Sequence, residues 1–322
     1  MKLSMVALSL SHENLSTLKQ VGINDVVHYN MSDIPEDLAE LRKIRDTYAR
    51  FELAWKVAES GPAIDKVVLG KPGAADQTER YKRMLGHLGS LGVETVVYNF
   101  MPQVGPDAMV VRTSFDAVTR GGAKTSRFRL AEVGPDTMTH AESAIPREKM
   151  WENLETFLRE VLPAAEAAGV KLAMHPDDPP LSPLCGLERI MDKEESFDRL
   201  LSISSSPANA ITFCVGCFAE LGSDLLKLID RYRHRIACVH IRNIAGTPHD
   251  FIETFPDEGN VDLVAVIRKL YDIGFNGYLR SDHAPRLATD HVVTHEGYGI
   301  QGHLYAIGYL RGLLHASRVG KG

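Results

Sequence analysis

Apolar and polar positions alternate along this chain in a pattern that repeats eight times. In each repeat, a short apolar run typical of a buried strand precedes a longer stretch with apolar residues at helical spacing. The runs that we predict as strands are Lys2–Leu10, Asp25–Tyr29, Phe51–Ala58, Val93–Phe100, Val170–Met174, Ala210–Val215, Arg235–Ile241 and Phe275–Arg280. The predicted helices are His12–Gln20, Pro35–Tyr48, Asp76–Leu91, Pro146–Ala168, Leu187–Ser202, Glu220–Arg233, Val261–Ile273 and Gly302–His315. Gly169 is expected to end the fourth of these helices.

This alternation predicts the fold class. Strands separated by helices lie parallel, and eight such units favour closure into an α/β protein of the (β/α)₈ TIM-barrel type. A doubly wound open sheet has the same alternation, but no GxGxxG motif follows the first apolar run. Because no stretch reads as a linker, we predict one barrel domain over residues 1–322.

One connection is much longer than the rest. Residues 101–145, after the fourth strand, have only weak patterning and carry several arginines. Loops of this length inside a compact domain are usually lids, binding loops or oligomer contacts, and a solvated excursion is the alternative. We predict a long insertion here and leave these roles open.

Composition and charge narrow the classes of partner. Hydrophobic residues make up 44% of the chain and charged residues 24%, as in an ordinary globular protein. The formal net charge of −6 argues against nonspecific binding to nucleic acid or anionic membrane, since both need clustered basic charge. No apolar run is long enough for a membrane helix, and Met1–Leu8 is too short for a signal peptide. Sparse cysteines then favour a reduced, cytoplasmic protein.

Four successive predicted strands end in side chains able to bind a metal. These are His175, Cys214, His240 and Asp282. In a TIM barrel the carboxyl ends of the strands meet at one face, which carries the active site. Two imidazoles, a thiolate and a carboxylate suit Zn²⁺, Fe²⁺, Mn²⁺ or Co²⁺ better than Ca²⁺ or Mg²⁺.

Each of these residues also has a plainer interpretation. A single histidine at a strand end is more often a hydrogen-bonding residue, and a buried cysteine is usually a small hydrophobic residue. Cys214 and Cys217 form a CxxC motif, which is also found in redox pairs and zinc knuckles. Because there is no second CxxC and no thioredoxin-like context, we favour the metal site.

The motifs at these strand ends resemble those of the D-mannonate dehydratases, which are xylose-isomerase-like barrels. The similarity runs in order over most of the chain. The matching segments are Val97–Pro102, His175–Pro180, Thr212–Gly216, His240–Asn243, Ser281–His283, Gly297–Gly299 and Ala306–Leu313.

The resemblance implies a Mn²⁺- or Fe²⁺-dependent hydro-lyase of hexuronate catabolism. Such an enzyme converts D-mannonate to 2-keto-3-deoxy-D-gluconate and water. The resemblance implies His175, Cys214, His240 and Asp282 as metal ligands, and it implies His283 and Tyr298 as the catalytic pair.

Some segments depart from the family's pattern. The family's Arg-Trp-Tyr-Gly-like stretch in the first strand is replaced by Met5–Leu10, and its Pro-Val-His-Glu-Asp segment appears as Gly61–Asp65 without the histidine. Its Arg-Pro-Asp-His-Gly becomes Arg280–Ala284. The half of the barrel that carries the ligands is therefore kept, and the first half is altered.

Elimination of water from a sugar acid needs stabilisation of charge on the carboxylate, a base for the C2 proton and an acid for the C3 hydroxyl. A divalent metal serves the first need. His283 and Tyr298 can serve the other two in either order, although a tyrosine base needs a lowered pKa.

Two further residues are candidate substrate contacts. Arg242, two residues beyond His240, either anchors the substrate or forms a structural ion pair with Asp177 or Asp178. Asn99, at the end of the fourth strand, either binds a substrate hydroxyl or satisfies backbone groups.

The remaining histidines are predicted to lie away from the site. His28 is interpreted as a packing or hydrogen-bonding position. Eight others are taken as surface or loop residues: His12, His87, His140, His249, His291, His295, His303 and His315.

Two other functions stay open at this point. A sugar isomerase or epimerase would use the same metal on the same barrel, and a noncatalytic relative would only bind sugar acids. For a dehydratase we expect a small sugar acid as substrate, no nucleic-acid or membrane partner, and a homo-oligomer.

Overall fold

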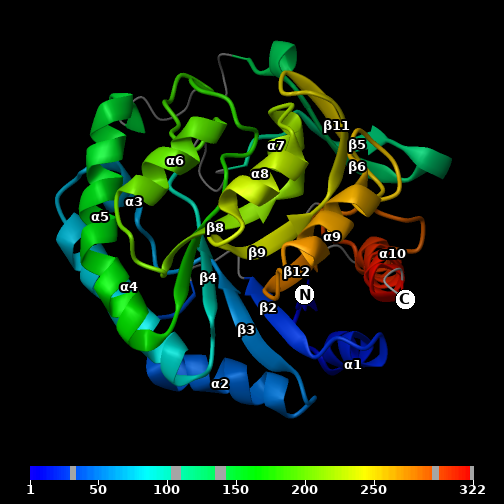
Figure 1. Ribbon diagram of the computed structural model, residues 1–322, viewed down its shortest axis with the longest axis horizontal. Coiled ribbons are helices and arrows are strands. Elements are labelled where there is room, and N and C mark those ends of the chain that lie inside the picture. The colour runs from blue at the N-terminus through cyan, green and yellow to red at the C-terminus, as the bar shows by residue number, and fades with distance from the viewer. Residues whose placement is uncertain (30–33, 103–109, 135–142, 292–296, 320–322) are drawn as a thin grey trace.

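The structure, a computed structural model, describes residues 1–29, 34–102, 110–134, 143–291 and 297–319. In these residues eight parallel strands close into a barrel, which confirms the predicted fold (Figure 1). In order around the barrel the strands are β1 (Lys2–Val6), β12 (Tyr278–Ser281), β9 (Ile236–Ile241), β8 (Asn209–Cys214), β7 (Lys171–Met174), β4 (Thr95–Tyr98), β3 (Ala54–Glu59) and β2 (Asp25–Tyr29).

Helices cover the outside of the barrel. They are α1 (His12–Gln20), α2 (Leu38–Ala49), α3 (Asp65–Leu69), α4 (Ala74–Ser90), α5 (Arg147–Ala168), α6 (Glu194–Ser202), α7 (Val215–Glu220), α8 (Leu225–Tyr232), α9 (Leu263–Asp272) and α10 (Ile300–Val319). Within the described part of the chain, no helix is both long and apolar enough to cross a membrane.

The barrel interior contains a layer of small and branched apolar side chains. Val6, Val27, Val57, Val97 and Ala173 belong to one buried cluster. Side chains two residues apart on a strand point to the same side. The residue two positions after each of these therefore faces the barrel axis at the carboxyl end, and on β7 that residue is His175.

Local chemistry explains where the predicted boundaries moved. The second helix begins at Leu38 rather than Pro35, because the Asp37 side chain caps it by accepting a hydrogen bond from the Glu40 amide. The helix predicted over Glu220–Arg233 begins only at Leu225, where Asp224 caps it, and α7 precedes it as a separate short helix. Gly169, with φ 67°, ends α5 as predicted.

The insertion after β4 contains more structure than its pattern indicated. Residues 103–109 and 135–142 lie outside the described residues, but between them the chain forms β5 (Ser114–Val118), η1 (Arg120–Gly122), β6 (Lys124–Arg129) and η2 (Leu130–Glu132). β6 pairs antiparallel with β11 (Asp250–Thr254), which pairs with β10 (Asn243–Thr247). Figure 1 shows this small sheet on one side of the barrel, with α4 and α5 on the other.

The sheet therefore corrects the interpretation of 101–145 as loop alone. Strand β6 is mostly polar, and its partner β11 is far away in the sequence. Phe128 lies opposite Phe251, and both are buried. The apolar contact that stabilises this pairing forms only when the chain has folded.

The contact between α4 and α5 leads to a prediction about stability. A Cβ at Gly89 would lie 2.3 Å from the backbone oxygen of Ala168, whereas a Cβ at Gly86, on the same helix, meets nothing within 4 Å. Gly89→Ala is expected to lower the free energy of unfolding by about 1–3 kcal/mol, because backbone has to shift. Gly86→Ala, the control, should leave it unchanged or raise it by up to about 1 kcal/mol. Urea denaturation followed by circular dichroism measures both, and equal stability of the two variants would contradict the packing.

Candidate metal centre and active site

Three of the predicted ligands come together at the carboxyl ends of β7, β8 and β9. The donor atoms of His175, Cys214 and His240 all lie within 4.8 Å of one another. Cys214 and His240 are buried, and the two imidazole rings are 5.1 Å apart. Parallel pairing aligns these residues, since Cys214 lies opposite His240 in the barrel sheet.

The surroundings of this group favour a thiolate at Cys214 and a proton on His175, which a bound metal ion would displace. Although burial lowers the pKa of His175, the nearby Cys214, Asp282 and Glu59 raise it to about 9. Burial raises the pKa of the Cys214 thiol, but hydrogen bonds with Cys217 and His175 and the charges of His175 and Arg242 bring it well below its usual value. A thiolate is the form of cysteine that binds metals.

The donor set therefore fits a divalent ion. The Nδ1 of His175 donates to the Pro176 carbonyl oxygen over 2.7 Å, which leaves Nε2 as the ligand atom. Two imidazoles and a thiolate suit Zn²⁺, Fe²⁺, Mn²⁺ and Co²⁺.

Asp282, the fourth predicted ligand, lies beside these three. Its Oδ2 is 3.8 Å from the Cys214 sulfur and accepts a hydrogen bond from Arg242 Nε over 3.0 Å. Its Oδ1 is 3.2 Å from Arg280. Burial raises the pKa of Asp282, but the charges of His283, Arg280, His240 and Arg242 outweigh this and hold the pKa well below its usual range, so the carboxylate is ionised.

Arg242 contacts carboxylates on all sides, so the structure favours the ion-pair alternative over the predicted substrate anchor. Its guanidinium is fully buried and pairs with Asp178, Glu220, Glu253 and Asp282. In this arrangement it has no exposed face for a substrate, which corrects the predicted role. Asp178 was one of the two partners expected for an ion pair.

The same guanidinium excludes a second metal site. Asp178, Cys217 and Glu220 also have donor atoms within 4.8 Å of one another. Arg242 Nη1 lies 2.5 Å from Glu220 Oε1, and its Nη2 lies 2.8 Å from Asp178 Oδ2 and 3.2 Å from the Cys217 sulfur. The positive charge that these three groups need is therefore supplied by the arginine.

His283 is held by a residue of the small sheet. Its Nδ1 donates to Glu253 Oε1 over 2.8 Å, and Arg112 holds the same oxygen over 2.7 Å. This fixes the imidazole so that Nε2 lies on the side of Asp282, 3.9 Å from Oδ1. Burial lowers the pKa of His283, but Glu253 and Asp282 more than offset it and raise the pKa overall.

Tyr298 packs among aromatic rings next to His283. Its ring stacks on Tyr29 and on His303 and meets His283 edge to face at 5.4 Å. Burial raises the pKa of Tyr298 well above its usual value, so the hydroxyl keeps its proton. The lowered pKa that a tyrosine base needs is not found.

His303 corrects another expectation, because it is fully buried rather than on the surface. Its Nδ1 hydrogen-bonds to Ser281 over 3.0 Å. His28, as expected, is a packing and hydrogen-bonding residue, with its Nδ1 2.6 Å from the Tyr48 hydroxyl. His140 and His295 lie outside the described residues.

Sequence reasoning missed three polar residues of this site, namely Glu59, Arg280 and Glu253. Glu59 ends β3, one residue beyond the predicted strand, and pairs with Arg280 over 2.6 Å. Glu59 would have been a candidate site residue if the predicted strand had been extended by one residue, because the carboxyl ends of the strands carry the active site. Arg280 lies two residues before Asp282, so alternation would have placed it on the same side. No sequence signal connects Glu253 with His283.

Asn99 follows β4, and its Oδ1 is buried with no hydrogen-bond partner among the described residues. It lies at the end of the barrel that carries His175, since the His175 amide donates to the carbonyl oxygen of the preceding Tyr98.

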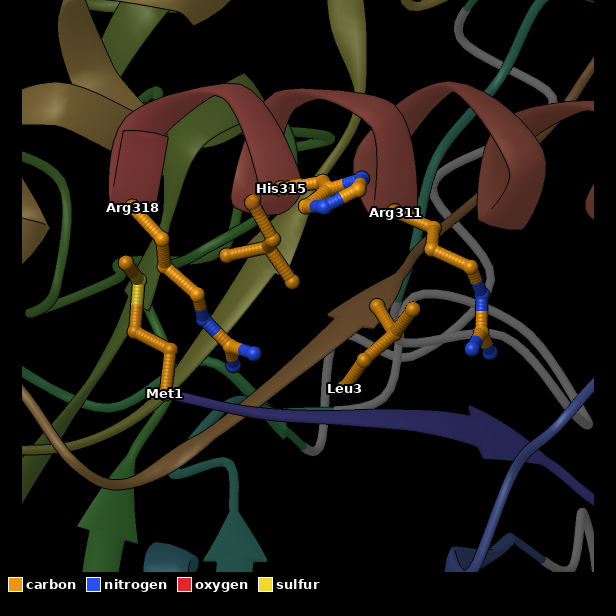
Figure 2. Close-up of a pocket in the computed structure, with 6 residues that line it drawn as sticks. Met1, Leu3, Arg311, His315 and Arg318 are labelled. Carbon is orange, nitrogen blue, oxygen red and sulfur yellow. The ribbon is translucent and has the colours of Figure 1, made fainter. Parts of the chain in front are cut away.

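A cavity lies at the opposite end of the barrel. It has a volume of about 200 Å³ between the start of β1 and α10. Figure 2 shows its lining, with His315, Arg311 and Arg318 on α10 above Met1 and Leu3. None of the candidate site residues lines it.

Comparison with known proteins identifies the family. The sequence model of D-mannonate dehydratase (UxuA) matches residues 9–144 and 129–321. Mannonate dehydratase 1 of Halalkalibacterium halodurans is 30% identical over 334 residues, which cover 93% of this chain and 91% of that protein.

The chain belongs to the D-mannonate dehydratase family. Another relative, the mannonate dehydratase of Oceanobacillus iheyensis, is 33% identical over 92% of this chain and 93% of its own length. These relatives are named as dehydratases, which are hydro-lyases. Metal dependence is general in the family, and His175, Cys214 and His240 form a group able to hold an ion.

Solved structures agree with this assignment. The mannonate dehydratase from Streptococcus suis serotype 2 aligns with a TM-score of 0.89 and 30% identity, over 100% of this chain and 96% of that one. A D-tagatose 3-epimerase-like protein aligns with a TM-score of 0.62 at 16% identity over the full length of both chains. The latter likeness shows the barrel fold only.

The metal centre leads to a prediction about Cys214. Cys214→Ser should weaken binding of Mn²⁺ or Fe²⁺ by roughly tenfold or more, because a serine hydroxyl stays protonated where the thiol ionises. Metal per chain, measured by mass spectrometry after dialysis, tests this directly. Cys185→Ser, at a partly buried cysteine outside the site, is the control and should keep its metal. Equal metal content in the two variants would remove Cys214 from the ligand set.

Proposed function

We propose that this protein is a metal-dependent hydro-lyase that converts D-mannonate to 2-keto-3-deoxy-D-gluconate and water. The observation that carries the proposal is a metal-binding group with His283 and Tyr298 beside it, in a chain that matches the dehydratase family over nearly its whole length. We propose His175, Cys214, His240 and Asp282 as the ligands.

Mn²⁺ or Fe²⁺ is the ion that we propose, following the family. When bound, a divalent ion stabilises the negative charge that develops on the substrate carboxylate as the C2 proton leaves. The residues around it then have to move two protons. A cytoplasmic location and a homo-oligomeric state stay predictions.

Tyr298 is proposed as the acid and His283 as the base. Burial raises the pKa of Tyr298, so its hydroxyl carries the proton that would go to the C3 hydroxyl as this leaves as water. His283 in its neutral form would take the C2 proton on Nε2, since Glu253 engages Nδ1. Its raised pKa makes it a stronger base and limits the neutral form to higher pH. The resulting enol becomes the 2-keto acid by tautomerisation.

A direct assay tests the reaction. Protein loaded with Mn²⁺ or Fe²⁺ is expected to form a 2-keto-3-deoxy acid from D-mannonate, and treatment with a chelator should abolish this. A product that is an epimer or isomer of D-mannonate, with no loss of water, would instead support the isomerase or epimerase alternative. Binding of D-mannonate without any product would support a noncatalytic relative.

The role of Tyr298 leads to a second prediction. Tyr298→Phe should lower kcat by roughly 10²–10⁴-fold with unchanged metal content, because the ring remains and only the proton donor is lost. Tyr305→Phe, at a tyrosine of α10 that is 39% exposed, is the control and should keep its activity. An unchanged kcat in Tyr298→Phe would exclude Tyr298 as the acid.

A further inference from the structure

Two oxygen atoms at the ends of adjacent strands are buried but accept no hydrogen bond among the described residues. They are Oε2 of Glu59, the last residue of β3, and Oδ1 of Asn99, which follows β4. A buried acceptor without a donor costs free energy, so most such atoms in native proteins have partners. Their clustering beside a candidate active site indicates that the donors come from a ligand.

Strand geometry turns both side chains toward the barrel axis. Val57 and Val97 belong to the apolar layer inside the barrel, and Glu59 and Asn99 lie two residues beyond them. Residues at this spacing share a side of the strand. In the β3–β4 pairing Glu59 lies opposite Val97, so the two side chains occupy the same end of neighbouring strands.

The Glu59 carboxylate is held in a fixed orientation. Its Oε1 accepts a hydrogen bond from Arg280 over 2.6 Å, and the side chain is 14% exposed. Its Oε2 lies 3.8 Å from His240 Nε2, beyond hydrogen-bond distance but next to the metal-binding group. Arg280 thus compensates the charge of Glu59 and leaves one oxygen open toward the site.

We propose that Glu59 and Asn99 form a subsite that binds hydroxyl groups of the substrate. This inference rests on the proposed function and adds how a polyhydroxy acid would be oriented. A carboxylate oxygen and an amide oxygen can only accept hydrogen bonds, so they match O–H donors. They would repel a substrate carboxylate, which therefore lies on the side of His175, Cys214 and His240.

Through this subsite, the first half of the barrel, whose motifs depart from the family's pattern, contributes to recognition of the substrate. As the partner of the Arg280 guanidinium, the Glu59 carboxylate can make a charge-assisted hydrogen bond, which is stronger than one to a neutral acceptor. A site built to bind a hydroxyl also discriminates against analogues that lack it, because its polar groups are then left unpaired. Glu59 therefore acts as a specificity determinant for hydroxylated acids.

Calorimetric titration of the metal-loaded protein tests the subsite. The ligands are D-mannonate and its 4-, 5- and 6-deoxy analogues, and a Tyr298→Phe background slows turnover. The protein is expected to bind D-mannonate more tightly than at least one analogue, by roughly ten- to hundredfold if Glu59 accepts the missing hydroxyl. Glu59→Gln should weaken binding of D-mannonate by that factor but leave binding of that analogue unchanged. Asn99→Leu should weaken binding of D-mannonate by a smaller factor, roughly three- to tenfold. It should leave unchanged the binding of the analogue that lacks the hydroxyl accepted by Asn99.

Controls separate this role from others. Glu79→Gln, at an exposed carboxylate of α4, should leave all affinities unchanged. Metal content is measured in every variant and should not change. Loss of the metal in Glu59→Gln would make Glu59 a ligand and overturn the subsite. The subsite would also be overturned if both variants still bound D-mannonate more tightly than its deoxy analogues by the original factor.

The outcome is also distinguishable from failure of the proposed function. A protein whose discrimination depends on Glu59 but that forms no 2-keto acid would uphold the subsite and contradict the dehydratase. A protein that dehydrates D-mannonate while both variants discriminate as before would uphold the dehydratase and contradict the subsite. A protein that binds none of these acids would overturn both.

Discussion

The guanidinium of Arg242 holds together four buried carboxylates that come from separate parts of the chain. Glu220 belongs to α7, Glu253 to β11, Asp178 to the segment after β7, and Asp282 follows β12. A buried charge is tolerated only when it is paired, and loss of one partner from such a network typically costs about 3–5 kcal/mol. The chain makes room for this contact at Gly216, where a Cβ would lie 2.5 Å from Arg242 Cγ.

This network connects the two sheets of the molecule to the site. Asp282 belongs to the barrel and lies beside Cys214, whereas Glu253 belongs to the small sheet and holds His283. Arg112, from the insertion after β4, pairs with both Asp178 and Glu253. The small sheet is thus part of the candidate active site, since it supplies the carboxylate that orients His283, the proposed base. The barrel alone would leave that imidazole without its partner.

The charges also divide the barrel mouth into two regions. His175, Cys214 and His240 lie on neighbouring strands and offer donor atoms to a cation. Glu59 and Asn99 lie on the next two strands and present open acceptor oxygens. A sugar acid has a carboxylate at one end and hydroxyls along the rest, so its polarity complements this division.

The sequence by itself determined the barrel, and it brought His175, Cys214 and His240 to one face. It could do so because buried parallel strands are continuous apolar runs, and each candidate ligand lies at or next to the carboxyl end of its run. Tertiary structure alone decided the small sheet, since polar β6 gains its apolar contact only by pairing with distant β11. It also decided that Arg242 forms ion pairs and that His303 is buried, because both outcomes depend on side chains that meet only in the folded chain.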